Sequence, residues 1–128
     1  MGGLGRAFDG GYAEHTRTPV KNVQTVKGGE EPGWEVIGAI PEMLQTAWGS
    51  LFTALRLKKG ERLLVRGGIT SVGLAATVIA TNHGAHVVST TRMRDREAVL
   101  KESGANEVII DDGTIASKSA RSLTECWN

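Results

Sequence analysis

The chain has 128 residues, 40% of them hydrophobic, so it is long enough to bury the core of one domain. Its 15 basic and 14 acidic residues give a formal net charge of +1, which favours neither a nucleic acid nor a membrane surface as partner. A single cysteine excludes an internal disulfide and a cysteine zinc site, and the three histidines lack metal-ligand spacing, so we expect no metal. Without an apolar membrane span or a signal peptide, a cytoplasmic location is expected.

Residues 1–33 are rich in glycine, threonine and charged side chains, and their periodicity is weak. The segments YAEHTRTPV (12–20) and NVQTV (22–26) are predicted as short strands, and KGGEEPG (27–33) is typical of a loop. This region is too short to form an independent domain.

Residues 34–57 carry apolar side chains at helical spacing. Pro41 suits the first turn of a helix, where its missing N–H costs no hydrogen bond. Gly60, which follows two lysines, is expected to end the segment. We expect Trp48 and Phe52 to belong to the core. The apolar residues at this spacing are Met43, Leu44, Ala47, Trp48, Leu51 and Leu55.

The following segments alternate between strand and helix patterns. ERLLVRG, AHVVSTT and NEVII are predicted as strands, because continuous apolar runs are typical of parallel strands covered on both faces. SVGLAATVIATNHG and MRDREAVLKESG are predicted as helices that end at Gly84 and Gly104. The β-α-β-α-β order with short links indicates an α/β fold, a parallel half-sheet that is one half of a Rossmann domain. A complete doubly wound sheet needs about three more strands.

Gly67, Gly68 and Gly73 surround the junction between the first of these strands and its helix. Backbone N–H groups and the positive end of the helix dipole can bind a phosphate there. Leu74 stands where a P-loop needs lysine, so a kinase or ATPase is excluded. The dinucleotide fingerprint G-x-G-x-x-G is met in part, with Thr70 in place of the middle glycine. A tight structural turn without a ligand is the alternative.

The residues at the end of the second predicted strand favour NADP(H) over NAD as the cofactor. NAD-binding proteins usually have Asp or Glu about 20 residues beyond the glycines, and no acidic residue occurs here before Asp95. Hydroxyl and guanidinium groups occur instead, and these suit a 2′-phosphate. Arginines at a helix start oppose the helix dipole and need an anion or a partner, although a solvated helix start is the alternative. The side chains concerned are Ser89, Thr90, Thr91, Arg92, Arg94 and Arg96.

Four segments, FDGGYAEH, GAIPEMLQTAWGSLF, KGERLLVRGGITSVGLAA and GANEVIID, together resemble the zinc-independent quinone oxidoreductases of the medium-chain dehydrogenase/reductase superfamily. The similarity covers nearly all of residues 1–118. It implies a Rossmann domain beside a GroES-like β domain, and hydride transfer from NADPH to a small quinone, enone or carbonyl compound. A homodimer is the expected state of full-length members of the family.

The resemblance also implies residue roles by matching position. The turn from Gly67 to Gly73 would line the pyrophosphate, and Thr90, Arg92 and Arg96 would face the 2′-phosphate. Thr46 would lie near the nicotinamide, unless its hydroxyl bonds its own helix backbone. No catalytic residue is assigned. The residues expected to bind the cofactor are Thr46, Gly67, Gly68, Thr70, Ser71, Val72, Gly73, Thr90, Thr91, Arg92 and Arg96.

The resemblance further implies a piece of the family fold, truncated at both ends. Residues 1–33 match the end of the GroES-like catalytic domain, and residues 34–128 a partial Rossmann domain. Residues 119–128 depart from the family. One choice of codons for 121–128, read two bases later, gives Glu-Ser-Asp-Gly-Val-Leu-Glu, the expected start of a strand, and suggests a frameshifted tail as a hypothesis.

Three functions are therefore open. The first is an NADPH-dependent oxidoreductase, which we expect by resemblance. The second is a dinucleotide-binding fragment without turnover. The third is a nonfunctional truncated product, whose half-sheet would have an open edge and an exposed apolar face. We expect the isolated chain to have little or no activity, and the substrate is not identified.

Overall fold

The computed structural model describes residues 5–25 and 33–115 of the chain. The chain divides into two compact units between Gly33 and Trp34. Most of the predicted loop at 27–33 and all of the atypical tail at 119–128 lie outside the described residues. That the first unit is the end of a GroES-like domain stays a prediction.

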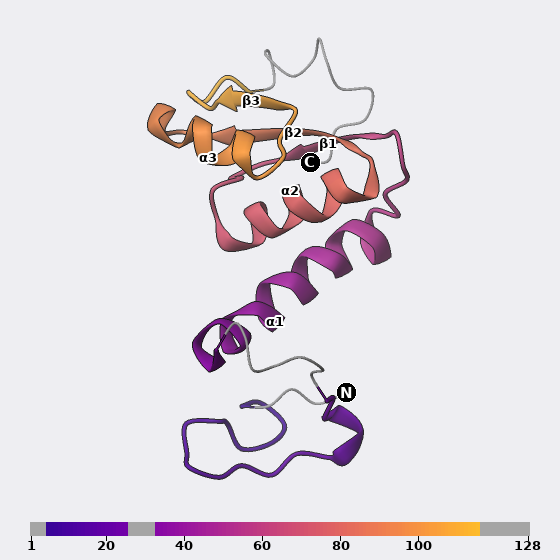
Figure 1. The fold of residues 1–128 in the computed structure, drawn as a ribbon, viewed down its shortest axis with the longest axis vertical. Helices are drawn as coiled ribbons and strands as arrows, with labels where there is room; N and C mark the ends of the chain where they lie inside the picture. Colours follow the sequence, from indigo (N-terminus) through magenta and orange to yellow (C-terminus); the bar gives the residue numbers. More distant parts are fainter. Residues whose placement is uncertain (1–4, 26–32, 116–128) are drawn as a thin grey trace. The chain divides into compact units, whose positions relative to one another are not determined.

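The second unit contains a parallel three-stranded sheet with β2 at its centre (Figure 1). Its strands are β1 (Arg62–Val65), β2 (His86–Thr91) and β3 (Glu107–Ile110). Leu64 of β1 pairs with Val88, and both neighbours of β2 run parallel to it. The three predicted strands and the α/β fold class are confirmed. The carboxyl ends of all three strands therefore lie at one edge of the sheet.

Two helices make the crossovers between these strands. α2 (Ser71–His83) contacts β1 and β2, and α3 (Glu97–Glu102) contacts β3. A short 3-10 turn, η3 (Arg94–Arg96), precedes α3. α2 ends at Gly84, whose φ of 90° is the left-handed conformation that glycine adopts without strain. Both predicted helices are confirmed, with a 3-10 turn at the start of the second.

A further helix, α1 (Trp34–Trp48), packs against α2 on the side away from the sheet (Figure 1). The core of the unit lies between the end of this helical segment, α2, β1 and β2. Small residues on α2 let it approach the sheet closely, and Ala80 is completely buried. The residues of this core are Leu51, Leu57, Leu63, Val65, Ala80, Ala85 and Val87.

A buried pair of hydroxyl groups joins α2 to the central strand. Thr77 of α2 and Ser89 of β2 are fully buried, and their side-chain oxygens are 2.9 Å apart. Each hydroxyl needs such a partner, because a buried polar group without one is costly. Ser89 also packs closely against Gly68, because a Cβ added to Gly68 would lie 3.0 Å from the Ser89 Cβ. The hydrogen bond that fixes Ser89 therefore also supports the glycine turn.

The strands predicted at 12–20 and 22–26 are wrong over the described residues. The first unit instead has a 3-10 turn, η1 (Val20–Asn22), and no extended strand within residues 5–25. A strand is stable only where a neighbouring strand pairs with its N–H and C=O groups. No such neighbour occurs in the described part of this unit.

Both ends of α1 differ from the prediction. The helix begins at Trp34, so Pro41 lies inside it and removes one hydrogen bond to the carbonyl of Ile37. The helical segment continues as a π-helical turn, η2 (Gly49–Ala54), and ends well before Gly60. Arg56 takes the left-handed conformation (φ 55°), and the Leu57 N–H then donates to the carbonyl of Leu51 at 2.9 Å. Burial of Leu57 in the core explains this early reversal.

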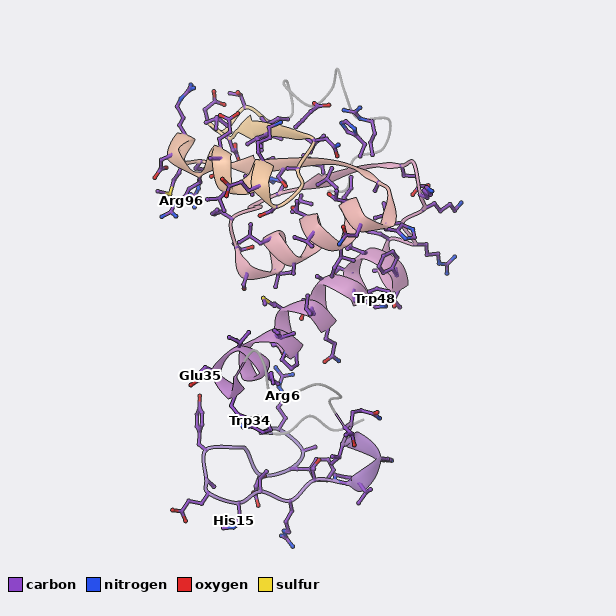
Figure 2. All side chains as sticks on the ribbon, in the orientation of Figure 1. Arg6, His15, Trp34, Glu35, Trp48 and Arg96 are labelled. Carbon is purple, nitrogen blue, oxygen red and sulfur yellow. The ribbon has the colours of Figure 1, made fainter. Side chains whose placement is uncertain are left out.

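The prediction that Trp48 is a core residue is also wrong, because its side chain is 59% exposed (Figure 2). Phe52 does pack partly buried against the core. Its ring lies 4.4 Å from that of Trp48 and 4.9 Å from that of His83, between centroids.

A polar cluster joins the amino-terminal ends of the three strands. Glu107 Oε1 accepts hydrogen bonds from Arg62 Nη2 and His86 Nε2, each at 2.8 Å. The bonds from His86 and then Arg62 hold the pKa of Glu107 below its ordinary value of 4.5, although partial burial opposes this shift. Each of these residues begins a different strand, so the cluster fixes the edge opposite the strands' carboxyl ends.

We expect Glu107→Gln to make the protein less stable at neutral pH but not in acid. A carboxyl whose folded-state pKa is lowered contributes stability above its unfolded-state value, and this is lost as the pH falls through the lower folded-state value. The difference between wild type and variant should therefore shrink as the pH falls below 4.5. Urea unfolding from about pH 7 to about pH 3 measures it.

The control is Glu102→Gln, because Glu102 is an exposed residue of α3 whose carboxylate has no described hydrogen bond or ion pair. This variant should match wild type at every pH. A Glu107→Gln difference of the same size in acid and at neutral pH would contradict the proposed contribution of the cluster.

Candidate functional site

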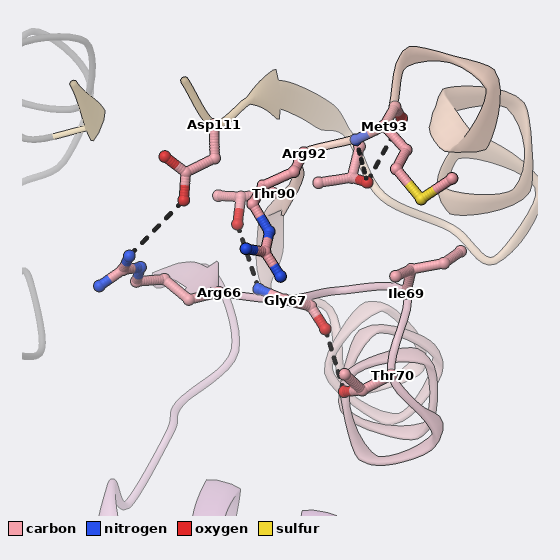
Figure 3. A pocket seen from close by; sticks show the side chains of 9 residues that line it. Arg66, Gly67, Ile69, Thr70, Thr90, Arg92, Met93 and Asp111 are labelled. Atoms are coloured by element: carbon pink, nitrogen blue, oxygen red, sulfur yellow. Dashed lines mark hydrogen bonds and ion pairs between the residues drawn. The ribbon is translucent and has the colours of Figure 1, made fainter. Parts of the chain in front are cut away.

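A cavity of about 440 Å³ opens at the edge of the sheet where the strands have their carboxyl ends (Figure 3). In open parallel sheets this edge is where ligands bind. The volume lies within the range of small-molecule sites. The cavity is lined by Arg66, Gly67, Ile69, Thr70, Thr90, Thr91, Arg92, Met93 and Asp111.

The glycine turn is held against β2 by two hydrogen bonds to Thr90, one to its hydroxyl and one to its carbonyl. The Gly67 N–H donates to the hydroxyl of Thr90 at 3.2 Å, and the Gly68 N–H donates to its carbonyl at 2.9 Å. Gly67 has a φ of 65°, which is unstrained only for glycine. A side chain on Gly73 would place its Cβ 2.6 Å from the carbonyl oxygen of Gly67. The turn and the start of α2 are therefore in direct backbone contact.

Thr70 takes the place of the fingerprint's middle glycine and caps α2. Its hydroxyl donates to the carbonyl of Gly67 at 3.0 Å and accepts from the Gly73 N–H at 3.1 Å. An N-cap of this kind contributes about 1 kcal/mol. The N–H groups of Ser71 and Val72, in the first turn of α2, have no intrahelical acceptor and receive no side-chain cap. They are available to an anion at the positive end of the helix dipole.

Three charged side chains surround the cavity (Figure 3). Arg66 Nη2 lies 3.5 Å from Asp111 Oδ2, so these two charges offset each other. The guanidinium of Arg92 is exposed and has no hydrogen bond or ion pair with the described residues. The cavity therefore offers one uncompensated cation and one helix N-terminus, an arrangement that suits a ligand with separate phosphate groups.

Known proteins share this part of the fold. Lovastatin diketide synthase of Monascus pilosus is 38% identical over 91 residues, which are 71% of this chain and 4% of that protein. Quinone oxidoreductase of Pongo abelii is 32% identical over 101 residues, or 79% of this chain and 30% of that protein. A mycobacterial protein complexed with NADPH matches with a TM-score of 0.66 and 26% identity, over 72% of this chain and 28% of that one.

Over the part of the chain that they cover, these relatives and solved structures support the quinone oxidoreductase-like branch of the medium-chain dehydrogenase/reductase superfamily. It spans 4% of the length of the diketide synthase and 30% of that of the quinone oxidoreductase. No protein-family model matches the chain. In residues 5–25 and 33–115, no helix is both long and apolar enough to cross a membrane, and no three potential metal ligands gather.

This quinone oxidoreductase-like structure brings most of the predicted cofactor residues together. Gly67, Thr70, Thr90, Thr91 and Arg92 line the cavity. The remaining residues of the predicted turn are part of the same strand-to-helix junction, directly beside the cavity. They are Gly68, Ser71, Val72 and Gly73. Their roles in binding stay predictions.

Two predicted residues lie apart from the cavity lining. Thr46 is an exposed residue of α1, and its hydroxyl makes none of the described hydrogen bonds, so it does not bond its own helix. Arg96 is exposed at the start of α3 (Figure 2), where its Nε lies 3.8 Å from a carboxylate oxygen of Asp95. The roles of Thr46 and Arg96 in binding stay predictions.

Sequence reasoning missed three residues that line the cavity, Arg66, Met93 and Asp111, whereas Ile69 lies within the predicted turn. A usable signal existed for two of them. Arg66 directly follows β1 and Asp111 directly follows β3. Because the ends of parallel strands meet at one edge, the residue after each strand is a candidate for the site there.

Proposed function

We propose that this chain binds NADPH at the carboxyl end of its sheet, as part of an oxidoreductase that reduces a small quinone, enone or carbonyl compound. The observation that carries the proposal is the presence of an uncompensated guanidinium, Arg92, and the N-terminus of α2 at one cavity. The mycobacterial relative in complex with NADPH and the similarity to quinone oxidoreductases support it. A homodimer and a cytoplasmic location stay predictions.

The residues present fit the adenosine and pyrophosphate portions of the cofactor. The N–H groups of Ser71 and Val72 would bind the pyrophosphate at the positive end of α2. Arg92 would bind the 2′-phosphate through two parallel hydrogen bonds. The absence of an acidic residue at the end of β2 leaves no repulsion against that phosphate there. Bound NADPH would supply a hydride, and the transfer requires the substrate to be held against it with water excluded.

Calorimetric titration of the purified chain with NADPH, and separately with NADH, tests this proposal. NADPH should bind at least about 10-fold more tightly, because a hydrogen bond between charged groups contributes about 1.5–3 kcal/mol. Equal affinities would contradict the role of Arg92. No binding of either nucleotide by a folded sample would contradict the site itself and favour a structural turn without a ligand.

A turnover assay with NADPH and a simple quinone distinguishes an oxidoreductase from a chain that binds the dinucleotide without reaction. Oxidation of NADPH that depends on the quinone is the result expected of a complete reductase. Binding without turnover would favour the second function. A chain without a cooperative unfolding transition would favour the third, a nonfunctional product.

A further inference from the structure

The ion pair between Arg66 and Asp111 crosses the central strand at the cavity. Arg66 follows β1 and Asp111 follows β3, with β2 between them. The Asp111 side chain is 16% exposed and that of Arg66 is 68% exposed. Asp111 is also fixed locally, since its Oδ1 accepts from the Gly113 N–H at 2.9 Å and its own N–H donates to the carbonyl of Thr91 at 2.8 Å. Arg66 has no second described partner.

This arrangement places a mostly buried carboxylate beside a site that is proposed to bind phosphates. A carboxylate without a partner would repel each phosphate, and the repulsion would be strong because the side chain is largely withdrawn from water. Arg66 offsets that charge at small cost, because its own side chain remains hydrated. Two arginines line the cavity, and the ion pair with Asp111 engages Arg66. Arg92 is therefore the arginine of the cavity lining that has no described ion-pair partner.

We propose that Arg66 is a positioning residue that acts through Asp111 rather than by binding the ligand. It neutralises the Asp111 carboxylate, so that the cavity accepts an anion, and leaves recognition of the 2′-phosphate to Arg92. This inference rests on the proposed binding of NADPH. It differs from the reading that Arg66 is a second phosphate ligand, and the two readings predict opposite results for a double variant.

The test is a set of calorimetric titrations of wild type, Arg66→Gln, Asp111→Asn and the double variant with NADPH and NADH. Arg66→Gln should weaken NADPH binding about 10-fold, because it leaves the carboxylate uncompensated. The loss should be smaller for NADH, which carries one phosphate fewer. The double variant should return to within about threefold of wild type, and Asp111→Asn alone should bind NADPH at least as tightly as wild type.

Lys58→Gln is the control, since Lys58 is an exposed cation that does not line the cavity and whose side chain has no described hydrogen bond or ion pair. Thermal unfolding of each variant checks that it is folded. A double variant as weak as Arg66→Gln, or weaker, would overturn the inference and make Arg66 a direct ligand. If wild type binds neither nucleotide, both this inference and the proposed function fail. Binding by wild type without rescue in the double variant overturns this inference alone.

Discussion

Replacing Gly73 with alanine is expected to lower the free energy of unfolding by about 3 kcal/mol and to abolish NADPH binding. The new Cβ would lie 2.6 Å from the carbonyl oxygen of Gly67 and 2.9 Å from two backbone atoms of Gly68. No rotamer change can relieve a contact between backbone atoms and a Cβ. Either α2 moves away from the turn or the turn opens, and both changes displace the N–H groups proposed to bind the pyrophosphate.

Gly38→Ala provides the matched control, because it makes the same substitution in a helix where nothing lies within 4 Å of the new Cβ. Alanine in a helix interior is favoured over glycine, so this variant should be more stable by about 1 kcal/mol. Urea unfolding measures both stabilities, and calorimetric titration measures NADPH binding. A Gly73→Ala protein with wild-type stability would show that the turn and α2 are not in the contact described here.

The alternating part of the fold could be predicted because its signals are local. Each apolar run from β1 to β3 is bounded by a glycine or a charged residue, and Gly84 and Gly104 both take the left-handed φ that ends a helix. The first unit could not be predicted in the same way. Its valines and threonines are residue types that favour strands, yet strand formation depends on a partner that the local sequence does not reveal.

The limits of α1 were missed for a similar reason. Pro41 is compatible with a first turn and, at the cost of one hydrogen bond, with a helix interior. The burial of Leu57, rather than the glycine at position 60, decides where the helical segment ends. Both outcomes depend on tertiary packing, since the half-buried side chains of Ile37 and Ile40 stabilise the additional turns.

Within the candidate site, the glycine turn and the end of β2 were predicted from a motif, whereas Arg66 and Asp111 were not. They are far apart in the sequence, and only the parallel order β1-β2-β3 brings them to one cavity. Thr70 shows the converse case. It is a departure from the fingerprint, and its hydroxyl both caps α2 and closes the turn, which a glycine would not do.

Arg92→Gln is expected to weaken NADPH binding by about 10- to 100-fold and to leave NADH binding within about threefold of wild type. Arg92 lines the cavity and its guanidinium has no described partner, so its removal breaks no described hydrogen bond or ion pair. Stability should therefore be unchanged, and the loss should be confined to the ligand that carries a 2′-phosphate. Glutamine keeps the aliphatic start of the side chain and a polar end but provides neither the charge nor the forked pair of donors.

Arg94→Gln separates this effect from a general loss of positive charge at the edge of the sheet. Both arginines are exposed and two residues apart, but only Arg92 lines the cavity. Calorimetric titrations at two salt concentrations should show a weaker salt dependence for Arg92→Gln than for Arg94→Gln, because a direct charge pair with the phosphate is lost in the first variant alone. Equal losses for NADPH and NADH in Arg92→Gln would instead place this guanidinium at the pyrophosphate, which both nucleotides share.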